Sequence, residues 1–279
     1  MLFRSIPDAD PEIERKSFIV ADGFEVNLFA ADPLIHKPIQ MNFDPQGRLW
    51  IAASETYPQI APGQKANDKI LILEDTDGDG KYDKSTVFLD KLNFPNGVMP
   101  WRDGVLISAA PDVLFARDTN GDGRADEVKV LLTGFGEGNQ QHRVNGFNWG
   151  LDNMVHCANG DSGGDIECVR TGTRVKLGRS DFRFDPRTGE FRLETGCTQC
   201  GKWRDDFGNW FGNNNANPMY HYVLDDYYIR RNPHVAPPDP RKQVSVTSGP
   251  SPVFPISRTL ARFNDFAMAN RFTSANSAM

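Results

Sequence analysis

The segment Ile70-Leu-Ile-Leu-Glu-Asp-Thr-Asp-Gly-Asp-Gly80 recurs 43 residues later as Val113-Leu-Phe-Ala-Arg-Asp-Thr-Asn-Gly-Asp-Gly123. In both copies a short apolar run leads into a loop of acidic residues and glycines. A second apolar pattern recurs at residues 47–53, 104–110 and 153–159. Repeats of roughly 40–50 residues, each built of several short strands, are typical of β-propeller blades. The two repeats therefore predict an all-β protein of the β-propeller class.

Hairpin signals between the repeats support an all-β fold. Residues 41–51 alternate polar and apolar side chains around a turn at Asp44 to Gly47, and residues 182–193 do the same. Helical periodicity is almost absent from the chain. A β-sandwich with one accidental repeat is the alternative, but two independent strand patterns recur, which favours the propeller.

The repeats also suggest how the chain is divided. We expect an N-terminal extension over residues 1–16, a propeller domain over 17–279 and regular blades over about 20–196. Residues 203–228 are rich in aromatics and residues 233–255 in prolines, so we expect a long irregular insertion over about 197–255. Only three or four blades can be counted, whereas closed propellers of this kind have six or seven. The chain is therefore expected to be a truncated propeller protein with an incomplete set of blades.

Composition excludes several classes of protein. With 25 glycines, 19 prolines and 24% charged residues, the 279-residue chain is turn-rich but globular. The net charge of −6 argues against a general nucleic-acid binder. No apolar run approaches the roughly 18 residues of a membrane span. The first 16 residues show no secretory signal, and four cysteines are too few for a disulfide scaffold.

The two repeated loops have the pattern of calcium sites. Calcium prefers six to eight oxygen ligands, which acidic side chains at alternate positions supply when a glycine at position 6 allows a sharp turn. Position 7 adds a backbone carbonyl, and an aspartate at position 9 is expected to close each loop. An acidic turn without metal is the alternative. The expected ligands are Asp75, Asp77, Asp79, Lys81 and Asp83 in one loop, and Asp118, Asn120, Asp122, Arg124 and Asp126 in the other.

A candidate active site lies in the polar segment Gly138 to Gly164. His142 precedes an expected strand, and Asp161 follows the next strand, so both side chains could return to one end of a blade. A carboxylate that orients an imidazole produces a general base. From spacing alone, a loop histidine bonded to backbone and a turn aspartate, both without catalytic roles, are the favoured interpretation.

The segment from His142 to Gly164 resembles the catalytic-face motif of the glucose/sorbosone dehydrogenase family, the soluble quinoprotein propellers. Most of the chain, residues 17–272, more closely resembles planctomycete-type proteins described as membrane-bound dehydrogenases. This resemblance rests on the segments 22–31, 92–101, 138–164 and 252–258.

The resemblance implies oxidation of a sugar or polyol, with pyrroloquinoline quinone (PQQ) as hydride acceptor, His142 as base and Asp161 as its orienting partner. Arg143 and Asn145 are the expected cofactor-binding residues, and Arg204 is a further candidate, although none of them matches the family's cofactor-binding arginine. The resemblance also implies a periplasmic or cell-envelope location and a cytochrome c domain or protein as electron acceptor. Haem attachment in this chain is not expected, because Gly201 follows the Cys197 to Cys200 motif where a histidine is needed.

Two other functions stay open at this stage. One is a non-catalytic, calcium-stabilised propeller that binds carbohydrate, with aromatics stacking on sugar rings and Asn213, Asn214 and Asn215 bonding to hydroxyls. The other is a calcium-dependent lactonase-type hydrolase, which needs carboxylate and asparagine ligands at a central metal. The aromatics concerned are Trp203, Phe207, Trp210, Phe211, Tyr220 and Tyr222.

Overall fold

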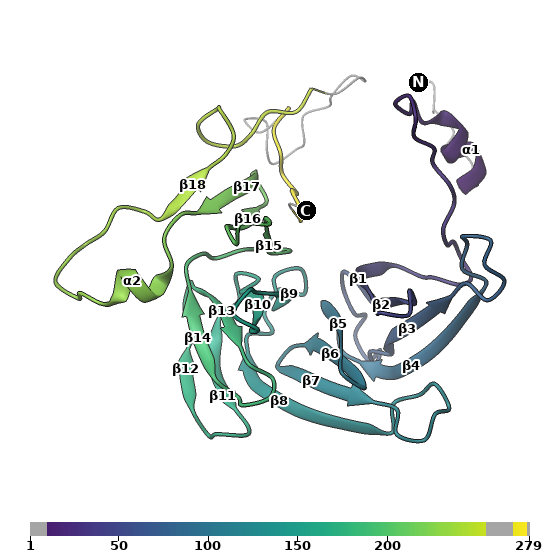
Figure 1. The fold of residues 1–279 in the computed structure, drawn as a ribbon, viewed down its shortest axis with the longest axis horizontal. Helices are drawn as coiled ribbons and strands as arrows, with labels where there is room; N and C mark the ends of the chain where they lie inside the picture. The colour runs from purple at the N-terminus through teal and green to yellow at the C-terminus, as the bar shows by residue number, and fades with distance from the viewer. Residues whose placement is uncertain (1–9, 255–269, 278–279) are drawn as a thin grey trace.

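The computed structural model describes residues 10–254 and 270–277. Within these residues the chain forms four antiparallel sheets, which follow one another along the sequence (Figure 1). Two short helices, α1 (Pro11–Ser17) and α2 (Asp226–Arg230), are the helical elements of this part of the chain. The all-β prediction is confirmed.

The first sheet contains the first predicted hairpin and the first acidic loop. Its strands follow sequence order, β1 (Pro38–Phe43), β2 (Leu49–Ala53), β3 (Asp68–Glu74) and β4 (Lys84–Leu92). Every residue of β2 is buried, as expected for a strand with apolar neighbours on both faces. The predicted turn is present, because the N–H of Gly47 donates to the carbonyl of Asp44 at 2.9 Å.

The second sheet is enlarged by strands that come later in the chain. After β5 (Gly97–Trp101), β6 (Gly104–Ala109), β7 (Asp112–Arg117) and β8 (Glu127–Phe135), its edge is extended by β11 (Gly164–Cys168) and β12 (Arg174–Lys176). The third sheet consists of β9 (Asn145–Trp149), β10 (Val155–Ala158), β13 (Asp181–Phe184) and β14 (Phe191–Glu194). The chain therefore leaves the third sheet after β10, pairs with β8 and then returns.

The expected irregular insertion contains a fourth sheet, which corrects that part of the sequence-based prediction. Its strands are β15 (Trp203–Arg204), β16 (Trp210–Asn214), β17 (Asn217–Tyr222) and β18 (Arg241–Gln243). Aromatic residues favour strands, and turns at residues 205–209 and 215–216 join the first three strands. Irregular backbone dominates between β17 and β18, where α2 lies, and over residues 244–254; residue 255 lies outside the described residues.

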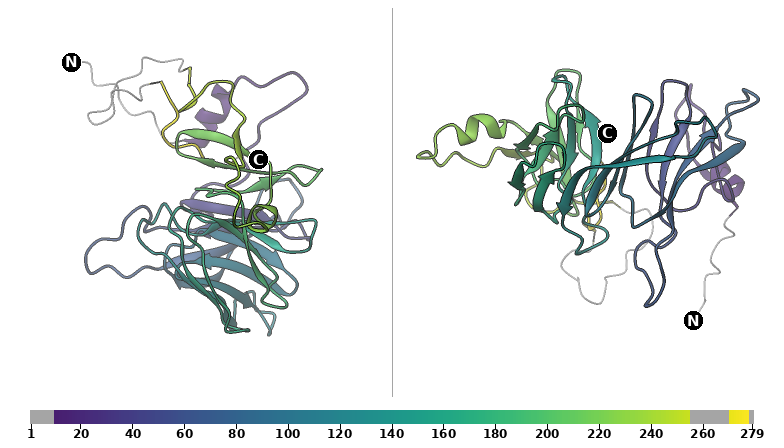
Figure 2. Two further views of the ribbon diagram at one scale, coloured as in Figure 1. Left: turned by 90° about the vertical axis from the view of Figure 1, so that its left-hand side faces the viewer. Right: turned by 90° about the horizontal axis from the view of Figure 1, so that it is seen from below.

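The sheets lie side by side in an arc, as blades of a propeller do (Figures 1 and 2). The first strands of neighbouring sheets contact each other, β1 with β5 and β5 with β9. One apolar core, which includes Ile107 and Trp50, lies between the first and second sheets. Another, which includes Phe135 and Phe182, lies between the second and third. Burial of each such side chain contributes about 1.5–3 kcal/mol, so each sheet is stabilised mainly by its neighbours.

This topology gives the arc two distinct faces. In each sheet the first and third strands begin at the same end of the arc. We call this end the start face. The opposite end, where hairpins join the first strand to the second, is the hairpin face. Since the acidic loops join third strands to fourth strands, they lie on the hairpin face, whereas His142 and Asp161 lie in connections on the start face. The described residues include no helix long and apolar enough to cross a membrane.

Candidate functional site

The two acidic loops have nearly the same internal hydrogen bonds. In the first loop the Asp75 carboxylate accepts from the N–H groups of Gly78 and Gly80 at 2.7 and 3.0 Å. In the second loop Asp118 accepts from Gly121 and Gly123, both at 2.7 Å. The N–H of Gly123 is the main reason why the pKa of Asp118 lies below its usual value. These backbone hydrogen bonds therefore hold the first aspartate of each loop in position and favour its ionised form.

The donor set of both loops fits a calcium ion. One carboxylate oxygen each of Asp75, Asp77 and Asp79 lies within 4.8 Å of the other two, and Asn120 takes the place of Asp77 in the second loop. These hard oxygen donors, close together on a glycine-rich turn, are the ligands that calcium prefers.

The position-9 aspartates accept hydrogen bonds within their own loops, and their role as calcium ligands stays a prediction. Asp83 accepts hydrogen bonds from the hydroxyl of Thr76, the shorter of 2.7 Å, and Asp126 accepts one from Thr119 at 2.8 Å. In this geometry Asp83 and Asp126 fix the ends of their loops. The ligand contributions of Lys81 and Arg124 through their carbonyls stay predictions.

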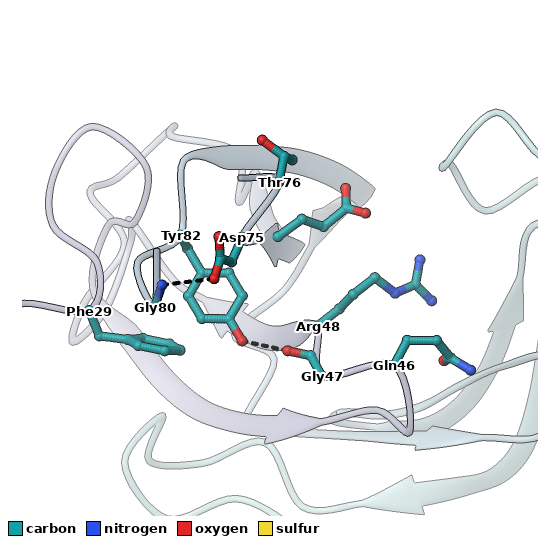
Figure 3. A pocket seen from close by; sticks show the side chains of 9 residues that line it. Phe29, Gln46, Gly47, Arg48, Asp75, Thr76, Gly80 and Tyr82 are labelled. Atoms are coloured by element: carbon teal, nitrogen blue, oxygen red, sulfur yellow. Dashed lines mark hydrogen bonds between the residues drawn. The ribbon is translucent and has the colours of Figure 1, made fainter. Parts of the chain in front are cut away.

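The first acidic loop also forms one wall of an open cavity of about 690 Å³ (Figure 3). Phe29 from the N-terminal segment and Tyr82 line it, their ring centroids 4.1 Å apart. The Tyr82 hydroxyl donates to the carbonyl of Gly47, which ties the end of the loop to the β1–β2 hairpin. This cavity belongs to the hairpin face.

A second cavity, of about 330 Å³, lies on the start face where the four sheets meet. We call it the central cavity. Its described lining contains no Asp, Glu, Lys or Arg, and it is dominated by amide side chains: Gln40, Asn96, Gln140, Gln141, Asn145, Gln199, Asn215 and Asn276. The rest of the lining is Pro38, Ile39, Tyr57, Gly146, Cys200, Gly201, Ser274, Ala275 and Ser277.

His142 and Asp161 are brought together beside this cavity. His142 Nδ1 lies 3.7 Å from an Asp161 carboxylate oxygen, and the two side chains are 27% and 31% exposed. His142 Nε2 lies 3.1 Å from Nε2 of Gln199, a lining residue. The other Asp161 oxygen accepts from the Cys197 thiol at 3.3 Å. Burial, followed by this carboxylate, raises the pKa of Cys197 to about 12, so the thiol stays protonated.

Gly160 allows the two loops to approach so closely. Its φ is +72°, and a Cβ there would lie 2.0 Å from the carbonyl oxygen of Arg143. Any side chain would therefore separate the Asp161 loop from the His142 loop. The Ser162 hydroxyl completes the contact by donating to the carbonyl of His142.

The two expected cofactor-binding residues do not offer free groups to the central cavity. Arg143 is 4% exposed, does not line the cavity, and lies over the ring of Phe94 while donating to the carbonyl of Glu137. Asn145 lines the cavity, but its amide donates to two carbonyls and accepts from Gly201 N–H. Arg204 donates to backbone carbonyls at Trp149 and Asp205.

The described lining does not fit PQQ. A quinone that carries several carboxylates needs cationic partners, and the described lining supplies none. Arg143 has two buried nitrogens, Nε and Nη1, without a described partner, but the side chain lies outside the cavity wall. The same lining lacks the carboxylate that a lactonase-type metal centre requires.

The aromatics of this region differ in exposure. Tyr222 is 8% exposed, while the half-buried rings of Trp210 and Phe211 stack on His156 and His221. Trp203 and Phe207 are exposed, at 45% and 88%. Packing therefore accounts for Trp210, Phe211 and Tyr222, whereas Trp203 and Phe207 lie on the surface.

A buried ionic cluster joins the third and fourth sheets. Lys202 Nζ lies 2.7 Å from Glu194 and 3.4 Å from Asp181, and all three side chains are at most 5% exposed. Glu194 also lies 2.7 Å from His156 Nδ1. Burial alone would raise the pKa of Glu194, but Lys202 and His156 outweigh burial and lower it to about 2.

Sequence reasoning did not find Gln199 or this ionic cluster. Gln199 lies in the Cys197-Thr-Gln-Cys200 motif, which was interpreted only for haem attachment; all four cysteines are free thiols. A usable signal for the cluster exists, because Asp68, Asp112 and Asp181 each begin the third strand of a sheet. Comparison of the repeats would have singled out Asp181 as a recurring aspartate at this position.

Comparison with known proteins gives a family. Residues 10–279 match the family model described as "Domain of unknown function (DUF7133)". No curated protein matches this chain. Among solved structures, the chain is similar to a luciferin-regenerating enzyme, with 8% identity and a TM-score of 0.42 over 70% of this chain. The match spans 59% of that enzyme's chain.

The family match extends over the N-terminal segment, all four sheets and the loops that form the central cavity. The chain therefore belongs to the DUF7133 family.

Proposed function

We propose that the central cavity binds a neutral polyhydroxylated ligand, a sugar or a polyol. The observation that carries this proposal is the chemistry of the described lining, which is rich in amide side chains and has no Asp, Glu, Lys or Arg. Each primary amide offers donors and acceptors in fixed directions, which suits hydroxyl groups that both donate and accept. A charged ligand would lose hydration there without gaining a counter-charge.

The two acidic loops have a structural role in this proposal. We propose that each binds one calcium ion and that the ions stabilise the β3–β4 and β7–β8 hairpins. Because the loops lie on the hairpin face and the cavity lies on the start face, the ions stabilise the domain without touching the ligand.

Calorimetric titration tests the binding proposal. We expect saturable binding of D-glucose or D-sorbitol and at least about tenfold weaker binding of the anion D-gluconate, since an unpaired buried charge is costly. Gln140→Leu should weaken binding by removing a lining amide, and Asn27→Leu, on the exposed N-terminal segment, is the matched control. Flat titrations across a panel of neutral sugars and polyols would exclude the proposal.

A second candidate function, oxidation of the bound hydroxyl, is favoured by the contact between His142 and Asp161. In this candidate reaction His142 would accept the hydroxyl proton of the ligand, and the carbon-bound hydrogen would pass as hydride to a soluble quinone, which is reduced to the hydroquinone. Dye reduction with a soluble artificial quinone as acceptor and a panel of aldoses as substrates tests it, and His142→Gln should abolish the activity. Absence of dye reduction with every aldose removes this candidate.

A further inference from the structure

Gln199 is placed to control which nitrogen of His142 carries the proton. It lies between β14 and β15, on the start face, and is 7% exposed. Its Nε2 is 3.1 Å from His142 Nε2 and 2.8 Å from the side-chain oxygen of Asn215. A primary amide nitrogen has two hydrogens, so it can donate to both partners at once.

Asn215 fixes the orientation of the Gln199 amide. The backbone N–H of Asn215 donates to Gln199 Oε1 at 2.8 Å, while Asn215 Oδ1 accepts from Gln199 Nε2. Exchange of the amide oxygen and nitrogen would place donor against donor and acceptor against acceptor. The amide must therefore present its N–H, rather than its carbonyl, to His142.

His142 must then accept at Nε2. An imidazole nitrogen that accepts a hydrogen bond carries no proton, so the proton of the neutral ring is on Nδ1. Nδ1 is the nitrogen that faces Asp161, at 3.7 Å. In water the Nε2–H tautomer of a neutral histidine is the more common one, so the surroundings invert the usual preference.

We propose that Gln199 is a positioning residue, which holds His142 in the Nδ1–H tautomer and keeps the Nε2 lone pair directed towards the lining of the central cavity. This inference rests on the second candidate function, in which Nε2 takes a hydroxyl proton. The Gln199 N–H keeps Nε2 unprotonated, so the base has the correct tautomer before a ligand arrives.

The experiment is nitrogen NMR of the full chain with 15N-labelled histidine, recorded over a pH series so that the spectrum of the neutral His142 ring is observed directly. His142→Gln assigns the resonances, and the other four histidines of the chain are internal references. We expect the Nδ1–H form of His142 to exceed the Nε2–H form by about tenfold, the effect of one well-made hydrogen bond.

Variants of Gln199 separate this role from simple packing. A glutamate oxygen can only accept, so Gln199→Glu should move the proton of His142 to Nε2. Gln199→Met keeps the volume but removes the donor, and should return the ring to a mixture of tautomers. Gln141→Met, which changes a neighbouring lining amide, should leave the tautomer unchanged.

A wild-type spectrum with the proton on Nε2 would overturn the proposal whether or not the variants fold. So would Gln199→Glu and Gln199→Met spectra identical to that of the wild type. If the binding or oxidation proposal fails instead, the sugar titrations are flat or the dye is not reduced, while the tautomer of His142 is still the expected one.

Discussion

Asp68 illustrates how single buried acids hold the sheets of this protein in place. Its carboxylate is fully buried and accepts from the hydroxyls of Ser54 and Thr56, both at 2.7 Å, and from the N–H of Phe94 at 3.1 Å. Asp181 accepts a similar set at the equivalent strand start, from Asn159 N–H and Thr198. Both carboxylates tie a third strand to the connections around it.

Loss of this carboxylate should be costly. Asp68→Ala would leave several buried donors without an acceptor, and we expect a decrease of about 3 kcal/mol in the free energy of unfolding, measured in urea. Asp22→Ala, at an exposed position, is the matched control and should change stability by less than about 0.5 kcal/mol. Equal effects of the two substitutions would contradict the role assigned to Asp68.

Glu194 predicts a specific acid sensitivity. Its pKa is lowered from 4.5 in the unfolded chain to about 2 in the folded protein, because Lys202 and His156 outweigh the cost of burial. The stability that this shift provides is therefore fully present above about pH 4.5 and is lost as the pH falls towards 2.

Unfolding free energies measured between pH 6 and pH 2 should show this loss, on the order of 3 kcal/mol from this group. Glu194→Gln lacks the titrating group, so its stability should be lower at neutral pH and fall less steeply on acidification. Parallel pH profiles for the wild type and this variant would disprove the assignment.

The residue-level prediction of the site was uneven for physical reasons. The His142–Asp161 contact was predictable because strand order places both connections on one face. The orientations of Arg143 and Asn145 were not, because they depend on which carbonyls each side chain meets after folding. Gln199 contacts His142 while Asn215 orients the Gln199 amide, and such a chain of hydrogen bonds between separate loops leaves no spacing pattern in the sequence.

At the scale of elements, the acidic loops are the clearest repeated feature. Each closes a long hairpin, β3–β4 or β7–β8, at the same point of its sheet. The backbone hydrogen bonds within each loop hold its carboxylates in place. If calcium binds as proposed, it adds stability to the folded domain by mass action.

We expect calcium to raise the melting temperature of the chelator-treated protein by about 5–10 °C per site, when calcium is at about 100 times its dissociation constant. Asp75→Asn should remove one step of this increase and the double variant Asp75→Asn/Asp118→Asn both steps. Asp22→Asn serves as the control.

Differential scanning calorimetry with and without calcium gives the measurement. An unchanged melting temperature, with no heat of calcium binding, would mean that the loops are acidic turns without metal.

Element boundaries were predictable where turns are marked by Asp, Pro and Gly, as at Asp44 to Gly47. The fourth sheet was missed because its strands are short and its aromatics do not alternate regularly with polar residues. The pairing of β11 with β8 was missed for another reason: hydrogen bonding to a strand about 30 residues earlier in the chain leaves no local signal.

For the whole molecule, the excursion of β11 and β12 links two neighbouring sheets. Since the chain on both sides of this hairpin belongs to the third sheet, the second and third sheets cannot separate without breaking the β8–β11 pairing. They also share an apolar core. We infer that the two sheets unfold together.

Native-state hydrogen exchange measures this coupling. Amides of β8, β10, β11 and β13 should exchange with one common opening free energy, whereas those of β18, a three-residue edge strand, should open more easily. Separate opening free energies for β8 and β13 would show that the sheets unfold independently.

The separation of the two faces has a practical consequence. The acidic loops and the central cavity lie at opposite ends of the strands. A fluorophore, a surface tether or a capture antibody attached at the acidic loops would leave the mouth of the cavity open to solvent. In a sample immobilised in this way, the central cavity of every molecule would be equally accessible to small solutes.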